Sequence, residues 1–172
     1  MKYKKVSIIG LGFIGLPLFV YLNSKLNNQV LGIDKKSLLT EDKFSKLKRG
    51  INPIKSNDEN FDKLVKKISM RKLSLSTNIN DIKKTRVVVV SVGFDLTKRN
   101  SMNNLKKLFR KIGEVVEENT LIIFETTVLP GTSENIIIPI LKKETEKRDL
   151  DFRKIYFSYS FERIMPGKNY IE

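Results

Sequence analysis

One stretch, Val6-Ser-Ile-Ile-Gly10-Leu-Gly12-Phe-Ile-Gly15, decides the fold of this 172-residue chain. A short apolar run ends at the first of three glycines, and an amphipathic segment over about residues 13–26 follows them. The apolar run predicts a buried strand over 6–9, and the 3.6-residue pattern of the next segment predicts a helix. A strand, a glycine-rich turn and a helix in this order indicate the first unit of an α/β protein.

The same alternation of elements continues to the end of the chain. Further strands are expected at about residues 29–33, 87–92, 121–124 and 155–159, and two short features at 73–76 and 81–84 precede the strand at 87–92. Helices are expected at about 36–48, 60–69, 103–118 and 132–147. Right-handed crossovers then predict a doubly wound, mainly parallel, Rossmann-type sheet of about six strands in the order 3-2-1-4-5-6. The length suits a single domain over residues 1–172.

The composition narrows the class of protein and its chemistry. Hydrophobic residues make up 40% and charged residues 30% of the chain, and no apolar run is long enough to span a bilayer, so we expect a cytoplasmic protein. The sequence has no cysteine and no histidine. This removes thiolate nucleophiles and the commonest acid/base group and metal ligand, so no metal site is expected.

The formal net charge of +14 raises the question of a nucleic-acid partner. The lysines are spread along the chain without interleaved aromatic residues, and no helix-turn-helix or RNA-binding pattern accompanies them. The chain also lacks alanine and is rich in Lys, Ile and Asn, as expected from a genome poor in G and C. We therefore expect no nucleic-acid partner, although the positive field could attract smaller anions.

The three glycines have separate roles if the turn holds a dinucleotide. Gly10 permits the tight turn, Gly12 lets the backbone lie against a pyrophosphate, and Gly15 allows the helix to pack closely on the sheet. The pyrophosphate would sit at the positive N-terminus of that helix. Asp34 ends the next strand, nineteen residues after Gly15, where a carboxylate can accept hydrogen bonds from ribose hydroxyls. The alternatives are a packing turn for the glycines and an ordinary strand-end residue for Asp34.

Asp34 favours NAD over its phosphorylated form, because its charge repels a 2′-phosphate. Lys35 and Lys36 follow directly, and a basic side chain there could instead bind the 2′-phosphate of NADP. The cofactor-binding residues predicted in this first unit are Gly10, Gly12, Phe13, Ile14, Gly15 and Asp34.

Three polar turns follow the last three predicted strands. They read Ser91-Val92-Gly93-Phe94-Asp95, Glu125-Thr126-Thr127-Val128-Leu129-Pro130-Gly131-Thr132, and Ser158-Tyr159-Ser160-Phe161-Glu162-Arg163-Ile164-Met165-Pro166-Gly167. Ligands bind at the carboxyl edge of open parallel sheets, so these turns are a candidate site. In the second turn Thr132 is also expected to cap the following helix.

Together with Gly10-Leu-Gly12-Phe-Ile-Gly15-Leu-Pro17-Leu18, these turns resemble the UDP-glucose/GDP-mannose dehydrogenase family, most closely its branch acting on UDP-N-acetylhexosamines. Such enzymes oxidise the C6 alcohol of a nucleotide sugar to a carboxylate with NAD, for polysaccharide biosynthesis. The resemblance implies that Thr127 lies near the nicotinamide and positions a catalytic water. It also implies a catalytic Glu162 beside the reacting carbon, Arg163 at the substrate, and Val92 and Gly93 at the cofactor.

The sequence also departs from the family pattern. Val92-Gly93-Phe94-Asp95 stands where the family has V-P-T-P, which suggests a looser loop, and Phe161 replaces a proline before Glu162. Family members continue into a central helix and a nucleotide-sugar domain, which supply a cysteine nucleophile, a lysine, an asparagine and an aspartate. A cysteine-free chain lacks the thiol that would hold the aldehyde. We therefore expect little turnover from this chain alone, and a homodimer only where the central helix is present.

Two other interpretations remain at this stage. One is a different NAD-linked dehydrogenase of the 6-phosphogluconate or 3-hydroxyisobutyrate type, although the turns at 125–132 and 160–167 differ from that pattern. The other is a non-catalytic nucleotide-binding module, which the absence of Cys and His would fit.

Overall fold

The computed structural model describes residues 6–26, 29–54 and 58–161 of the chain. The strands are β1 (Val6–Ile9), β2 (Val30–Ile33), β3 (Ser74–Ser76), β4 (Val87–Val90), β5 (Thr120–Phe124) and β6 (Ile155–Tyr159). The helices are α1 (Gly15–Lys25), α2 (Leu38–Lys48), α3 (Glu59–Ser69), α4 (Ser101–Gly113) and α5 (Ile138–Glu146). Shorter turns of helix are η1 (Ile79–Lys84), η2 (Ser133–Ile137) and η3 (Phe152–Lys154).

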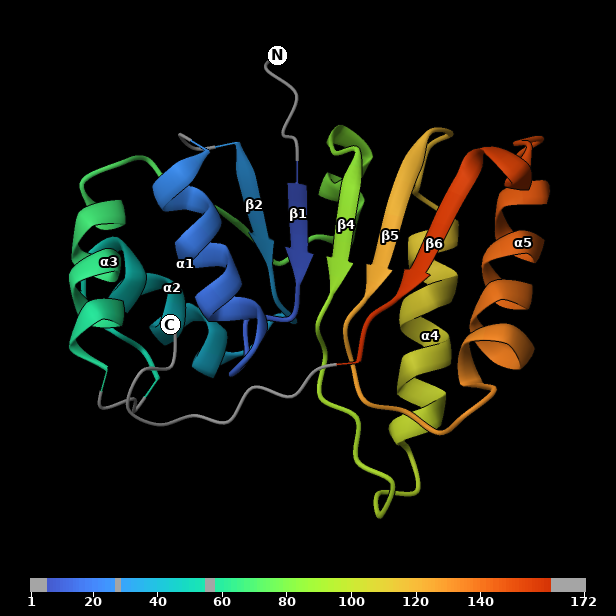
Figure 1. Cartoon of the computed structure of the whole chain (residues 1–172), viewed down its shortest axis with the longest axis horizontal. Helices are drawn as coiled ribbons and strands as arrows, with labels where there is room; N and C mark the ends of the chain where they lie inside the picture. The colour runs from blue at the N-terminus through green and yellow to red at the C-terminus, as the bar shows by residue number, and fades with distance from the viewer. Residues whose placement is uncertain (1–5, 27–28, 55–57, 162–172) are drawn as a thin grey trace.

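All of these strands join one parallel sheet in the order β3-β2-β1-β4-β5-β6. The arrows of Figure 1 accordingly all point the same way. This confirms the doubly wound fold and its predicted strand order. The segment at 73–76 is the short third strand, and the feature expected at 81–84 is part of the 3₁₀ helix η1.

Each central strand sends alternate side chains to opposite faces of the sheet, as the period of two requires. Ile8 packs in the cluster with α1 and α3, whereas its neighbour Ile9 packs in the cluster with α4 and α5. Val89 and Val90 divide in the same way. A strand buried on both faces must be apolar at every position, which explains why β4 reads as four consecutive valines.

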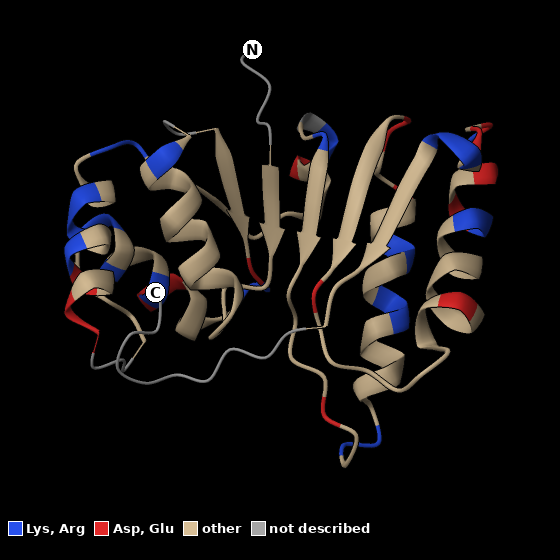
Figure 2. Ribbon diagram, viewed as in Figure 1, with Lys and Arg blue, Asp and Glu red and all other residues tan. Residues whose placement is uncertain are grey.

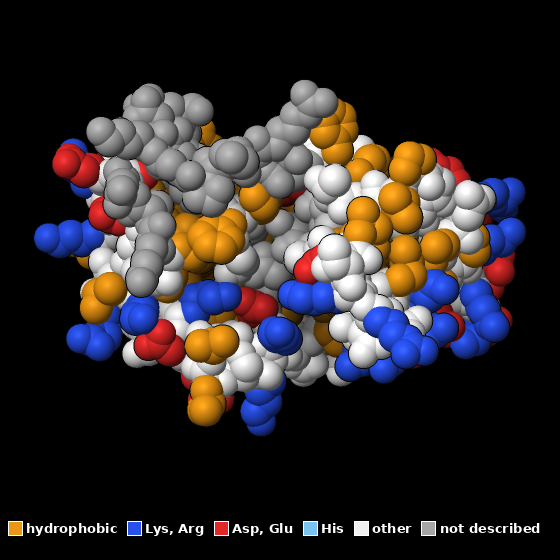
Figure 3. Space-filling view, turned by 90° about the horizontal axis from the view of Figure 1, so that it is seen from below, with side chains coloured by type: hydrophobic (Ala, Val, Ile, Leu, Met, Phe, Trp, Pro, Cys, Tyr) orange, Lys and Arg blue, Asp and Glu red, His pale blue; other side chains and the backbone are white. Residues whose placement is uncertain are grey.

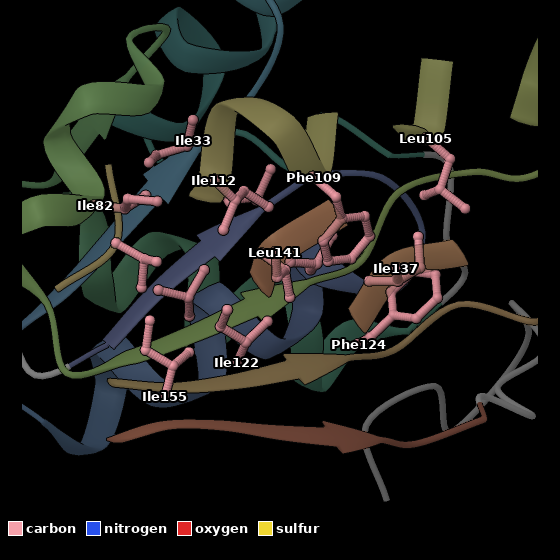
Figure 4. Packing of buried hydrophobic residues seen from close by; sticks show 14 of the residues in the cluster. Ile33, Ile82, Leu105, Phe109, Ile112, Ile122, Phe124, Ile137, Leu141 and Ile155 are labelled. Atoms are coloured by element: carbon pink, nitrogen blue, oxygen red, sulfur yellow. The ribbon is translucent and has the colours of Figure 1, made fainter. Parts of the chain in front are cut away.

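Aromatic rings anchor the larger cluster, between the sheet and the helices α4 and α5 (Figure 4). Phe109 of α4 meets Phe124 of β5 edge to face, with ring centroids 5.1 Å apart and an interplanar angle of 86°. Leu141 of α5 is also fully buried in this cluster. This packing holds the end of β5, and the polar turn after it, against α4 and α5.

The boundaries of several elements differ from the sequence prediction. Helix α1 begins at Gly15, because residues 11–14 form the turn, although the amide of Leu16 already donates to the carbonyl of Gly12. Strand β4 ends at Val90. Helix α4 runs over Ser101–Gly113 and not over 103–118, since residues 114–119 turn the chain back into β5 through Asn119 at φ 62°. No helix in the described ranges is long and apolar enough to cross a membrane.

The expectation that Thr132 caps the next helix is wrong. Its φ of −61° and ψ of −42° are helical, and its side chain makes no capping hydrogen bond. An N-cap side chain needs extended backbone to reach the amides after it. The turn is made one residue earlier by Gly131 at φ 79°, whose carbonyl accepts from the amide of Asn135. The helix then opens with the π-helical turn η2.

Candidate cofactor site

The register of the sheet brings the polar turns to one edge. Ile9 pairs with Ile33 on one side and with Val90 on the other, and Val90 pairs with Phe124. Phe124 in turn pairs with Tyr159. The next residue of each strand therefore leaves the sheet at the same level, and these residues are Gly10, Asp34, Ser91, Glu125 and Ser160. Figure 3 views the molecule from this edge, where acidic and basic side chains lie side by side across the middle of the face.

The glycine turn is shaped by close backbone contacts at Gly10 and Gly15. Gly10 has a φ of 91°, and a Cβ there would lie 2.1 Å from the carbonyl oxygen of Ser91. A Cβ on Gly15 would lie 1.9 Å from the carbonyl oxygen of Gly10. Neither position can accept a side chain without moving the backbone, so these two glycines build the turn itself.

Gly12 differs from both of these residues. It is exposed, and a Cβ built on it would meet no atom within 4 Å. No packing requirement in the described residues calls for glycine here. The N-terminus of α1 beside it has no side-chain cap and no acidic residue in its first turn. Open space next to uncapped helix amides is the arrangement that accommodates a pyrophosphate.

Asp34 is tied to the glycine turn by a lysine from the next helix. The Nζ atom of Lys43 lies 2.5 Å from Oδ2 of Asp34 and donates a 2.6 Å hydrogen bond to the carbonyl of Leu11. The backbone amide of Lys35 donates to Oδ1 of Asp34 at 2.8 Å. Only 15% of the Asp34 side chain and 21% of the Lys43 side chain are exposed. The carboxylate is thus held in one orientation at the end of β2.

Thr126 joins the turns after β4 and β5. Its hydroxyl donates to the carbonyl of Val92 at 3.0 Å and accepts from the amide of Val92 at 3.3 Å. Thr126 is 6% exposed, so this pair of bonds is shielded from water. One side chain therefore satisfies both backbone groups at the point where the chain leaves β4.

The loop after Val92 is anchored despite lacking the family's prolines. Phe94 packs against the larger hydrophobic cluster. Asp95 accepts from the amide and the hydroxyl of Thr97, and its own amide donates to the hydroxyl of Ser101. The hydrogen bonds from Thr97 lower the pKa of Asp95 below its ordinary value. A partly buried ring and the hydrogen bonds of Asp95 thus hold the loop that the sequence suggested to be looser, and Gly93 remains exposed with free space around it.

The site residues predicted in the second half of the chain fall partly inside and partly outside the described residues. Val92, Gly93 and Thr127 lie at the carboxyl edge with Gly12 and Asp34, and Thr127 is exposed there. Glu162 and Arg163 lie outside the described residues.

Lys43 and Thr126 were missed by the sequence analysis. Lys43 is one of many lysines, and only the fold shows that α2 turns this one back toward Leu11. Thr126 sits beside Thr127, and the alternation of strand β5 was the available signal that one of the two threonines points inward.

The parallel sheet, the open glycine turn and the fixed carboxylate define a dinucleotide-binding domain of the Rossmann type. Residues 4–172 match the family model described as UDP-glucose/GDP-mannose dehydrogenase family, NAD binding domain. The chain belongs to this family, and its cofactor is NAD.

Similar proteins include the UDP-N-acetyl-D-glucosamine 6-dehydrogenase of Pseudomonas aeruginosa, which is 34% identical over 97% of this chain and 37% of its own length. The UDP-N-acetyl-D-mannosamine dehydrogenase of Pyrococcus horikoshii is 29% identical over 98% of this chain and 38% of its own length. A solved structure of the UDP-D-ManNAc dehydrogenase from Pyrococcus horikoshii superimposes with a TM-score of 0.75 at 27% identity, covering 95% of this chain and 37% of that one. The chain therefore spans little more than a third of the relatives that it matches.

Proposed function

We propose that this chain is the NAD-binding part of a nucleotide-sugar 6-dehydrogenase. The reaction is oxidation of the C6 alcohol of a UDP-sugar, of the UDP-N-acetylhexosamine type, to a carboxylate for polysaccharide biosynthesis in the cytoplasm. One observation carries the proposal. The space beside Gly12 and the carboxylate of Asp34 lie at the same sheet edge, in a chain that matches the NAD-binding domain of this family over residues 4–172.

Bound NAD supplies the hydride acceptor, and the residues of this chain hold it in place. The backbone around Gly12 and the first amides of α1 are suited to the pyrophosphate, and Phe13 and Ile14 belong to the same turn. Asp34 accepts hydrogen bonds from the adenosine ribose. Lys43 keeps the Asp34 carboxylate turned toward the glycine turn, because it bonds to Asp34 and to Leu11 at once.

The catalytic roles rest on the family resemblance. Thr127 is exposed at the carboxyl end of β5, on the turn whose first threonine is fixed to Val92, and its role of positioning a water is the one that the family resemblance implies. Glu162 would assist proton movement beside the reacting carbon, with Arg163 binding the substrate. Val92 and Gly93 would border the nicotinamide end of the cofactor.

The second oxidation requires an aldehyde held covalently while hydride leaves again. A cysteine thiol does this in the family, and residues 1–172 contain no cysteine. We therefore propose that this chain binds NAD and does not by itself oxidise a nucleotide sugar.

Calorimetry of the chain with NAD and with NADP tests the cofactor part. Binding of NAD with clear preference over NADP is expected, and absence of any NAD binding would overturn the cofactor assignment.

The catalytic part of the proposal is tested by a chimera in which residues 4–172 replace the matching segment of the Pseudomonas aeruginosa relative. The chimera should oxidise UDP-N-acetyl-D-glucosamine, and a Thr127→Val chimera should be much slower. A folded chimera that binds NAD without turnover would instead favour a non-catalytic module.

A homodimer is proposed only for a chain that includes the family's central helix. One face of β6 packs toward α4 and α5, and on its other face Tyr156 is 54% exposed. This exposed face offers a surface on which an additional helix would pack. Analytical ultracentrifugation should find this chain monomeric and the chimera dimeric.

A further inference from the structure

The outer face of α4 carries cations without compensating acids. No acidic residue occurs between Leu96 and Gly113, whereas Lys106, Lys107, Arg110 and Lys111 follow one another along the helix. Figure 2 shows α4 with blue segments only, while α3 and α5 carry both signs. Four positive charges thus lie on this helix with no acidic residue among them.

The spacing of these four side chains is unfavourable for an isolated helix. Lys106 and Arg110 are four residues apart, as are Lys107 and Lys111, and like charges at that spacing repel each other. On α2 and α5 some cations at this spacing face an acid instead, since Lys46 pairs with Asp42 and Lys142 with Glu146. Among the described residues, no acid pairs with any of the four cations on α4. An anion bound at this face would remove the repulsion.

A hollow of about 230 Å³ lies on this face. It has room for roughly seven water molecules at the ~30 Å³ that each occupies in the liquid. Its lining consists of cations and side-chain amides, which are Asn100, Asn103, Asn104, Lys106, Lys107 and Arg110. Ammonium, guanidinium and carboxamide groups all donate hydrogen bonds, and together they match the oxygens of phosphate groups.

The hollow is separate from the cofactor site. Leu105 and Phe109 form the face of α4 that is buried against the sheet, so Lys107 and Arg110, which are exposed, lie on the other side of the helix. The glycine turn belongs to β1 and α1 on the opposite face of the sheet. A ligand in the hollow would therefore leave the NAD site free.

We propose that this hollow binds a free ligand with a di- or triphosphate group. Three cations line it, and a single phosphate carries a charge of only about −1.5 to −2 at neutral pH. A chain of two or three phosphates balances the cations and fills a space of this size. A flat anionic surface such as a membrane, or a nucleic-acid backbone, would use the projecting cations and leave the asparagine-lined hollow unused.

Inorganic tripolyphosphate is the probe, titrated calorimetrically into the chain with and without saturating NAD. The test variant is K106Q/K107Q/R110Q. The matched control is K63Q/K66Q/K67Q, which removes three positive charges from the exposed face of α3. Tripolyphosphate should bind in the presence of NAD, and the α4 variant should weaken it about tenfold or more, because charge-assisted hydrogen bonds are lost. The control should change its Kd by less than about twofold, since distant exposed charges are screened. Both variants should keep the NAD affinity of the original chain.

Three results would overturn the proposal. Displacement of tripolyphosphate by NAD would place it at the glycine turn. Equal weakening by both variants would show a diffuse effect of net charge. Absence of tripolyphosphate binding, with RNA or phosphatidylglycerol vesicles binding through α4, would assign the cations to a macromolecular surface instead.

Discussion

Lys43 bridges Asp34 and the glycine turn, with its Nζ atom 2.5 Å from Oδ2 of Asp34 and 2.6 Å from the carbonyl oxygen of Leu11. Both side chains are largely shielded from water, so the pair is less screened than the exposed ion pairs of the chain. The contact connects α2 to the turn between β1 and α1 and links the two parts of the proposed NAD site.

We predict that Lys43→Met weakens NAD binding about tenfold, because a hydrogen-bonded charge that orients Asp34 is worth about 1.5 kcal/mol or more. Isothermal calorimetry with NAD measures the effect. Lys46→Met is the control, since Lys46 pairs with the exposed Asp42 on the same helix. An equal loss in both variants would mean that general charge, and not the Lys43 contact, supports binding.

Substitutions of Gly10 and Gly12 should affect folding and NAD binding separately. Gly10→Ala should destabilise the fold by about 3 kcal/mol, because it combines an unfavourable positive φ with a backbone clash. Gly12→Val should change the free energy of unfolding by no more than about 0.5 kcal/mol, since open space surrounds it. It should nevertheless reduce NAD affinity by about tenfold or more, because the side chain fills the pyrophosphate space. Urea denaturation and calorimetry give the two values, and normal NAD binding by Gly12→Val would contradict the site.

Thr126→Val should destabilise the chain by about 1–3 kcal/mol, because both backbone groups of Val92 lose their buried partner. The shape of the side chain is kept, so the measured change reports the hydroxyl. Thr127→Val at the neighbouring exposed position should cost less, because water can replace a hydrogen bond that an exposed hydroxyl loses. A reversed order in urea denaturation would show that the two threonines had been assigned the wrong roles.

Glu118 makes part of the stability of the fold depend on pH. The amide of Asp151 and the ammonium of Lys154 bond to its carboxylate and lower the pKa of Glu118 below the ordinary value of 4.5. A lowered folded-state pKa stabilises the fold above the ordinary pKa, and the contribution is lost as the pH falls from about 4.5 through the folded-state pKa.

Glu118→Gln should therefore reduce stability at pH 7 and flatten the decline between about pH 5 and pH 3. Some decline will remain, because Asp95 and Asp151 also have lowered pKa values. Thermal unfolding across this range measures the difference. Glu114→Gln serves as the control for loss of one exposed carboxylate, and an identical pH profile for the two variants would refute the assignment.

The sequence alone determined the strands, their order and the position of the glycine turn. These features depend on local patterns. The four valines of β4 can be buried only in a strand covered on both faces, and Gly10 sits where no other residue tolerates the backbone. Asp34 could be placed as well, because a residue that directly follows a parallel strand must emerge at the carboxyl edge.

The tertiary structure alone decided which side chains hold these parts together. Lys43 reaches Leu11 across 32 positions and Thr126 reaches Val92 across 34, and no local pattern identifies these partners. The same is true of Thr132, which follows the general rule for a helix cap until Gly131 moves the turn back by one residue. Such contacts depend on how helices pack on the sheet, because packing brings together groups whose separation along the chain carries no information about their distance in space.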